Sequence, residues 1–150
     1  MLVTQLTYKQ KNVYNSMMND IYYNGGGLLF VYGYGGTGKT FVRRTLSSKI
    51  KSRGDIVLNV ALSGITSLLL PGGRTACSRF AIPLFLNEDS TCNISQCTHL
   101  IELIIQSKLI IWDEAPMMQK HYFEVLDKTM MDLLRFVIPG NAEKTFGGRQ

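Results

Sequence analysis

The chain has 150 residues, of which 45% are hydrophobic, so it is large enough for one globular domain with a buried core. Its 16 Lys and Arg residues against 11 Asp and Glu residues give a formal net charge of +5, which mildly favours an acidic partner such as nucleic acid. No apolar run approaches the roughly 18 residues of a membrane span, and residues 1–11 lack the apolar core of a signal peptide, so we expect neither a membrane protein nor a secreted one.

The first predicted element is an amphipathic helix that begins after Thr7. Thr7 and Gln10 have the spacing of a capping box, and the apolar residues that follow, Tyr14, Met17, Met18 and Ile21, recur at helical intervals. The glycine-rich residues 24–27 should end this helix. The next apolar run, residues 28–32, predicts a buried strand.

A glycine-rich loop follows this strand and fits the phosphate-binding pattern G-x-x-x-x-G-K-[ST]. Val42, Leu46 and Ile50 then predict a helix that Gly54 ends. Strand, glycine-rich turn and helix form the setting that the pattern requires. The predicted nucleotide-binding residues are Gln10, Gly33, Gly35, Gly36, Thr37, Gly38, Lys39 and Thr40.

The residue types in this loop suit a triphosphate. Glycines let the backbone wrap the phosphates, and successive N–H groups form a nest for anions at the start of a helix. Lys39 should reach the β- and γ-phosphates and assist catalysis, and the hydroxyl of Thr40 should ligate Mg²⁺. The basic residues on and after this helix read equally well as a solvated face or as a phosphate-backbone contact: Arg43, Arg44, Lys49, Lys51 and Arg53.

Residues 56–61 predict a second strand, and Ser63 is placed to cap a short helix over residues 65–70. Further along, Cys92, Cys97 and His99 suggest a zinc site, but the spacing C-x4-C-x-H is not that of a usual finger and no fourth ligand is near, so we expect no zinc. With Cys77, the cysteines number three, which indicates free thiols in a reducing compartment.

The last predicted elements are a helix over residues 99–106, a buried strand over 108–112, and a long amphipathic helix closed by Pro139-Gly140. Its apolar positions are Phe123, Leu126, Met130, Leu133 and Val137. Strands that alternate with helices predict an α/β fold with a mostly parallel sheet, in which ligands bind at the carboxyl ends of the strands.

Asp113 and Glu114 directly follow the strand at 108–112, so they should reach the same sheet edge as the glycine-rich loop. A nucleoside triphosphatase needs a Mg²⁺ ligand and a group that positions the attacking water. We expect Asp113 to hold the Mg²⁺ opposite Thr40. We expect Glu114 to be the general base.

Several segments resemble the amino-terminal half of the PIF-type (petite integration frequency) DNA helicases of superfamily one, over residues 6–148. These segments are Leu6-Thr7-Tyr8-Lys9-Gln10, residues 33–40, Ser63-Gly64-Ile65, Leu70-Pro71-Gly72-Gly73-Arg74-Thr75-Ala76, Ser78-Arg79-Phe80 and Trp112-Asp113-Glu114-Ala115-Pro116-Met117. The variant is most similar to eukaryotic, plant-type members, some of which are carried by Helitron transposons. The family's usual histidine is Cys77 here, which puts a polar contact at that position in doubt.

The resemblance implies a RecA-like P-loop domain that uses ATP and Mg²⁺ to move 5′ to 3′ on single-stranded DNA, in repair, recombination or telomere maintenance. It implies a nuclear or mitochondrial location. It also implies that Gln10 reads the adenine edge and that Ser63, Gly64 and Thr66 touch the single-strand backbone. The alternative for Gln10 is its capping role alone, and for Ser63 a helix cap.

The family continues past a Phe-Gly-Gly sequence into a Gly-Asp-x-Arg-Gln motif and a second RecA-like domain, whereas this chain ends at Arg149-Gln150. We therefore expect residues 1–150 to form one partial RecA-like domain, with the arginine finger of the second domain absent. Such a lobe should bind ATP, hydrolyse it very weakly and not unwind DNA. The alternatives are a non-catalytic ATP-binding module and a small-molecule kinase, which residues 112–115 and the lack of an arginine-rich lid disfavour.

Overall fold

The computed structural model describes residues 2–23, 28–83, 87, 89–92, 99–114 and 120–134. Helices and strands follow one another along these residues, although they do not alternate strictly as predicted. In chain order they are the short 3-10 helix η1 (Leu2–Gln5), α1 (Tyr8–Tyr23), α2 (Lys39–Ser52), β1 (Ile56–Ala61), α3 (Gly64–Leu68), β2 (Arg74–Thr75), α4 (Ala76–Phe80), α5 (His99–Gln106), β3 (Ser107–Asp113) and α6 (Lys120–Leu134).

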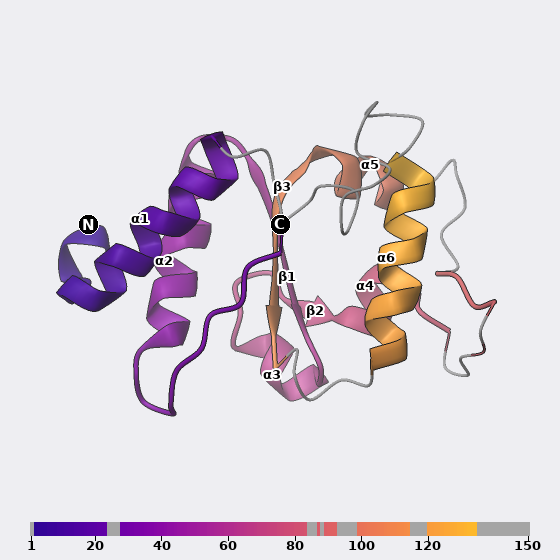
Figure 1. The fold of residues 1–150 in the computed structure, drawn as a ribbon, viewed down its shortest axis with the longest axis horizontal. Helices are drawn as coiled ribbons and strands as arrows, with labels where there is room; N and C mark the ends of the chain where they lie inside the picture. The colour runs from indigo at the N-terminus through magenta and orange to yellow at the C-terminus, as the bar shows by residue number, and fades with distance from the viewer. Residues whose placement is uncertain are drawn as a thin grey trace.

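The described strands form one parallel sheet in the order β2-β1-β3. β1 and β3 pair along their whole lengths, and Ala61 at the end of β1 lies opposite Asp113 at the end of β3. Helices α1 and α2 cover one face of the sheet, and α4, α5 and α6 cover the other (Figure 1). The predicted α/β class with a parallel sheet is therefore confirmed.

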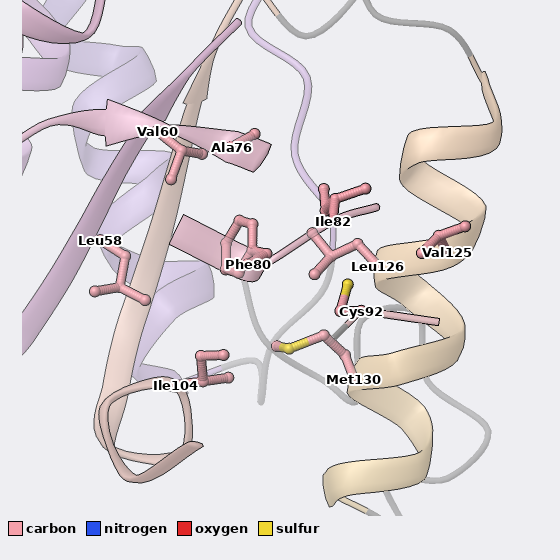
Figure 2. Packing of buried hydrophobic residues seen from close by; sticks show 10 residues of the cluster. All are labelled: Leu58, Val60, Ala76, Phe80, Ile82, Cys92, Ile104, Val125, Leu126 and Met130. Atoms are coloured by element: carbon pink, nitrogen blue, oxygen red, sulfur yellow. The ribbon is translucent and has the colours of Figure 1, made fainter. Parts of the chain in front are cut away.

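Each face of the sheet has its own buried core because alternate side chains of a strand point to opposite faces. Val57 in β1 and Leu109 and Ile111 in β3 pack against Leu46 and Ile50 of α2. The opposite core joins β1 to α4, α5 and α6; Figure 2 shows its residues Leu58, Val60, Ala76, Phe80, Ile82, Cys92, Ile104, Val125, Leu126 and Met130. A sheet covered on both faces holds the ends of β1 and β3 rigidly in place.

Local sequence signals mark the helix ends that were predicted from them: the starts of α1 and α3 and the end of α2. The backbone N–H of Thr7 donates to Oε1 of Gln10 (3.0 Å) and that of Gln10 to Oγ1 of Thr7 (3.4 Å), which forms the predicted capping box before α1. Gly54 has a φ of +86° just after α2, as a C-terminal glycine should. Ser63 caps α3 by accepting the N–H of Thr66 (3.1 Å).

The predicted strand over residues 28–32 is wrong. These residues belong to no strand and their side chains are exposed; Phe30 is 59% and Tyr32 is 85% accessible. An apolar run favours burial but does not supply a strand partner. Among the described residues β3 pairs only with β1, and residues 28–32 do not pair with its other edge. The two-residue β2, the short α4 and η1 were not predicted.

Some predictions fall outside the described residues: the glycine-rich stop at 24–27, Cys97, and the end of the last helix at Val137 and Pro139-Gly140. Cys92 is buried in the core beside α6, where its N–H donates to Oγ1 of Thr129 (3.0 Å), and burial raises the pKa of its thiol. In the described part of the chain, no helix has the length and apolar character needed to cross a bilayer.

Candidate nucleotide and metal site

The glycine-rich loop connects the exposed segment 28–32 to the first residue of α2, Lys39. Gly36 and Gly38 have φ values of +77° and +78°, a left-handed conformation that side chains other than glycine rarely adopt. A Cβ on Gly38 would also collide with the side-chain amide of Gln10. The loop residues up to Thr37 are solvent-exposed, so the loop is open to a ligand.

Within the loop, side chains bond to backbone carbonyls. The hydroxyl of Thr37 donates to the carbonyl of Tyr34 (2.8 Å), and the ammonium of Lys39 donates to the carbonyls of Gly33 and of Tyr34, the latter at 3.0 Å. Lys39 thus uses two of its three N–H donors on the loop itself. Gly38, the N-cap residue of α2, has no side chain to cap the helix, but its carbonyl accepts the N–H groups of Phe41 (3.0 Å) and Val42 (3.1 Å).

Gln10 links α1 to this loop. Its Oε1 accepts the N–H of Thr7 in the capping box, while its Nε2 donates to the carbonyl of Thr37 (3.1 Å). The sequence predicted the first bond; the second joins residues 27 positions apart and was not foreseen. One N–H and one oxygen lone pair of this amide remain after these two bonds are counted.

Arg43 brings the two predicted metal ligands together. It lies one turn after Thr40 on α2, and its guanidinium donates to Oγ1 of Thr40 (3.2 Å) and forms an ion pair with Asp113. The side chains of Arg43 and Asp113 are only 18% and 19% exposed. From the sequence, Arg43 was expected only as part of a general basic cluster, although its spacing of three from Thr40 puts both on the same helix face.

Asp113 and Glu114 stand where β3 ends, as predicted. Trp112, directly before them, packs against Phe80 and Phe123 with ring centroids 6.0 and 4.6 Å away, which anchors the strand end on the α6 side. Oδ1 of Asp113 accepts the N–H of Glu114 (3.0 Å). Glu114 has a φ of +58°, one of two non-glycine residues with positive φ among those described, so the turn that displays it is conformationally strained.

Ser63 and Thr66, predicted to touch DNA, lie beside Glu114. Oγ1 of Thr66 donates to Oε2 of Glu114 (3.0 Å), and Oγ of Ser63 is 2.8 Å from Oγ1 of Thr66. The pairing of Ala61 with Asp113 makes this possible, because it sets the start of α3 next to the residue after β3. The sequence predicted separate roles for the hydroxyls and the carboxylate, and their contact was not predicted.

The donor set suits Mg²⁺. Mg²⁺ prefers oxygen ligands and is commonly bound by one or two protein oxygens together with phosphates and waters. Thr40 offers a hydroxyl and Asp113 a carboxylate, and both already contact one cationic group, the guanidinium of Arg43. In the described residues no three His, Cys, Asp or Glu side chains cluster, so an all-protein cage for a metal is not formed there.

Comparison with known proteins supports one family. The model of the family described as "PIF1-like helicase" matches residues 5–150. Bacteroides Pif1 bound to ssDNA has a TM-score of 0.75 at 24% identity, covering 97% of this chain and 30% of that chain. Bacteroides Pif1 with ADP-AlF3 and ssDNA has a TM-score of 0.74 at 25% identity, with the same coverage. No curated protein matches.

A structure of two coordinating Pif1 helicases at forked dsDNA has a TM-score of 0.74 at 24% identity and covers 97% of this chain and 32% of that chain. These likenesses confirm the predicted RecA-like fold. The chain spans about a third of the length of the solved helicases that it matches.

Proposed function

The chain belongs to the PIF1-like helicase family, and on that premise we propose that it is the ATP-binding first lobe of a DNA helicase. The complete enzyme would hydrolyse ATP to move 5′ to 3′ along one DNA strand. One observation carries the proposal: the hydroxyl of Thr40 and the carboxylate of Asp113, from distant parts of the sequence, meet at the guanidinium of Arg43 on the carboxyl edge of the sheet.

The phosphates of ATP would lie in the exposed loop and against the first amides of α2, where the helix dipole favours anions. Lys39 would exchange its bonds to the carbonyls of Gly33 and Tyr34 for bonds to phosphate oxygens. That exchange is favourable because a hydrogen bond between an ammonium and a phosphate is charge-assisted on both sides. The remaining loop residues that line this position are Gly35, Gly36, Thr37 and Gly38.

Gln10 would read the adenine base. Its uncommitted N–H donor and lone pair complement the acceptor N7 and the donor N6 amino group of adenine, whereas guanine presents two acceptors on the same edge. The two bonds that Gln10 already makes, to Thr7 and Thr37, fix the orientation of its amide.

Thr40 and Asp113 would hold the Mg²⁺ that accompanies ATP, with Arg43 moving off both. When bound, the ion neutralises charge on the phosphate oxygens. Glu114 would accept a hydrogen bond from the attacking water and take its proton as general base. Asp113 supports this arrangement by fixing the backbone N–H of Glu114 (3.0 Å).

Single-stranded DNA would touch Ser63, Gly64 and Thr66. Gly64 is exposed, both hydroxyls are partly exposed, and the net charge of +5 favours a polyanion. We further propose that the chain is a plant-type, Helitron-like member that acts on DNA in the nucleus or mitochondrion, in repair, recombination or telomere maintenance. In this proposal residues 1–150 form one partial RecA-like domain, and a second motor domain supplies the arginine finger.

A second candidate function is an ATP-binding module with little turnover. The observation that favours it is that both carboxylates needed for hydrolysis already have side-chain partners, Asp113 with Arg43 and Glu114 with Thr66. Without the arginine finger, hydrolysis would be slower by about 10³- to 10⁵-fold. Single-turnover hydrolysis, with and without single-stranded DNA, distinguishes a slow enzyme from a binding module.

The experiment that tests the nucleotide site is binding of a fluorescent ATP analogue to Lys39→Ala. We expect the affinity to fall at least about a hundredfold, because several charge-assisted bonds to phosphate are lost. Lys51→Ala is the matched control, since it removes the same charge from an exposed position at the far end of α2. Equal affinity of Lys39→Ala and the unmodified chain would refute the site.

A further inference from the structure

Three oxygen atoms form a continuous chain from the start of α3 to the end of β3. Oγ of Ser63 is 2.8 Å from Oγ1 of Thr66, which is 3.0 Å from Oε2 of Glu114. Oγ of Ser63 also accepts the backbone N–H of Thr66 (3.1 Å). All of these contacts are part-buried, so water competes with them less than at an open surface.

The number of protons fixes the direction of this chain. An ionised carboxylate only accepts, and each hydroxyl has one proton to donate. The proton of Thr66 therefore points to Glu114, and the proton of Ser63 must point to Oγ1 of Thr66. Neither hydroxyl has a second proton for another acceptor.

A phosphate oxygen that arrives at Thr66 must therefore compete with Glu114. Phosphate is itself an acceptor with a negative charge, and a bond from Thr66 to it takes the proton away from Oε2 of Glu114. A phosphate can approach Thr66 from solvent, because Gly64 and Ile65, which lie between Ser63 and Thr66 in the sequence, are exposed.

The backbone conformation of Glu114 also makes its position depend on the bond from Thr66. Its φ of +58° is uncommon for a residue with a side chain, so the contacts around it must hold the conformation. Among the described residues, its N–H donates to Oδ1 of Asp113 and its carboxylate accepts the hydroxyl of Thr66. Loss of the second leaves the carboxylate free to turn toward a water molecule.

We propose that Thr66 is a positioning residue that holds Glu114 until a phosphate of single-stranded DNA takes over the Thr66 hydroxyl, and that this exchange couples DNA binding to ATP hydrolysis. The inference rests on the proposed function, since it needs Glu114 as base and DNA at α3. It adds a physical link between the two sites: one proton with two mutually exclusive acceptors.

The test compares Thr66→Val, which removes the hydroxyl and keeps the volume, with Thr66→Ser, which restores the donor. Ser67→Ala is the control, because its hydroxyl lies in the same helix but donates to the carbonyl of Gly64 (2.7 Å) rather than to Glu114. The first measurement is single-turnover ATP hydrolysis, with the chain in excess, with and without oligo(dT) of about 20 nucleotides. Circular dichroism confirms that each variant is folded.

We expect Thr66→Val to hydrolyse ATP about tenfold faster than the unmodified chain without DNA and to lose most of its stimulation by oligo(dT), since the bond it lacks is one to a charged group. Thr66→Ser and Ser67→Ala should behave like the unmodified chain. If oligo(dT) stimulates hydrolysis by Thr66→Val as strongly as hydrolysis by the unmodified chain, the proposal is wrong.

The second measurement does not need turnover. The affinity of fluorescein-labelled oligo(dT) is measured with and without ADP and aluminium fluoride, and the ratio is the coupling between the two ligands. We expect coupling in the unmodified chain and in Thr66→Ser, and none in Thr66→Val. Binding of both ligands without coupling in the unmodified chain overturns the inference alone; failure to bind oligo(dT) overturns the proposed DNA contact as well.

Discussion

The two halves of the candidate site are held in place in opposite ways. The glycine-rich loop is exposed and bonds mainly to its own backbone, through Lys39 and Thr37. The carboxylates at the end of β3 are partly buried and are held by side chains from other elements, Arg43 on α2 and Thr66 on α3.

This difference predicts that nucleotide binding and ATP hydrolysis depend on different halves of the site. A loop that bonds mainly to its own carbonyls, with Gln10 as its partner from α1, can open to phosphates at little cost to the rest of the fold. A carboxylate with a partner from another element responds to whatever moves that element. The loop side should therefore decide affinity for the nucleotide, and the carboxylate side should decide when hydrolysis occurs.

The largest expected effect comes from Glu114→Gln. The amide keeps an oxygen that can accept the Thr66 hydroxyl but cannot take a proton from water, so hydrolysis should fall by about 10²- to 10⁴-fold while ATP affinity stays within a factor of two. Single-turnover hydrolysis and fluorescent-nucleotide binding measure the two quantities. A parallel loss of affinity would show that the two halves are not separable.

Arg43→Met should have a smaller effect than Glu114→Gln, and it should be a gain, in affinity for the metal ion, rather than a loss. Arg43 occupies both proposed Mg²⁺ ligands, and its buried Nε has no hydrogen-bond partner among the described residues, so the guanidinium is imperfectly satisfied where it lies. Removal of it should raise the affinity for Mn²⁺, a paramagnetic substitute for Mg²⁺, by about fivefold in the presence of ADP.

Electron paramagnetic resonance of free Mn²⁺ measures that affinity. Arg44→Met is the control, because it removes the same charge from the next residue of α2, which is exposed. An equal gain in both variants would mean that general charge repulsion is responsible, rather than the contacts of Arg43 with Thr40 and Asp113.

The sequence predicted the parts of the site that depend on neighbours in the chain. The glycine-rich loop, the cap at Ser63 and the carboxylates after β3 are each set by a few consecutive residues, and the structure places them at the same edge. The contacts of Arg43 with Asp113 and of Thr66 with Glu114 could not be predicted, because they depend on the register that sets Ala61 opposite Asp113.

The wrong strand at residues 28–32 has the same origin. An apolar run such as Leu28–Tyr32 shows that burial would be favourable, but it does not say which strand edge supplies the hydrogen bonds. Among the described residues, the outer edge of β3 carries no other strand, yet residues 28–32 do not pair with it. The local pattern therefore had the residue types of a strand, but it could not show whether another strand pairs with it.

Gln10 tests how closely the first helix is tied to the loop, and its effect should be the smallest. Gln10→Ala removes the capping bond with Thr7 and the bond to the carbonyl of Thr37, so the free energy of unfolding should fall by about 1 kcal/mol. The preference for ATP over GTP should also fall, by about threefold to tenfold, because the donor–acceptor match with adenine is lost.

Gln10→Glu separates these two effects. Glutamate at this position keeps an oxygen for the N–H of Thr7 and suits the first turn of a helix, so urea denaturation should show a smaller loss of stability than in Gln10→Ala, although the bond to Thr37 is lost in both. It has no N–H to donate to Thr37 or to N7 of adenine, so the loss of base preference should remain. The ratio of ATP to GTP affinity cancels the repulsion between the new charge and the phosphates, which affects both nucleotides equally. If Gln10→Glu keeps the preference for ATP, Gln10 acts only as a helix cap, and the nucleotide is held by the loop without help from α1.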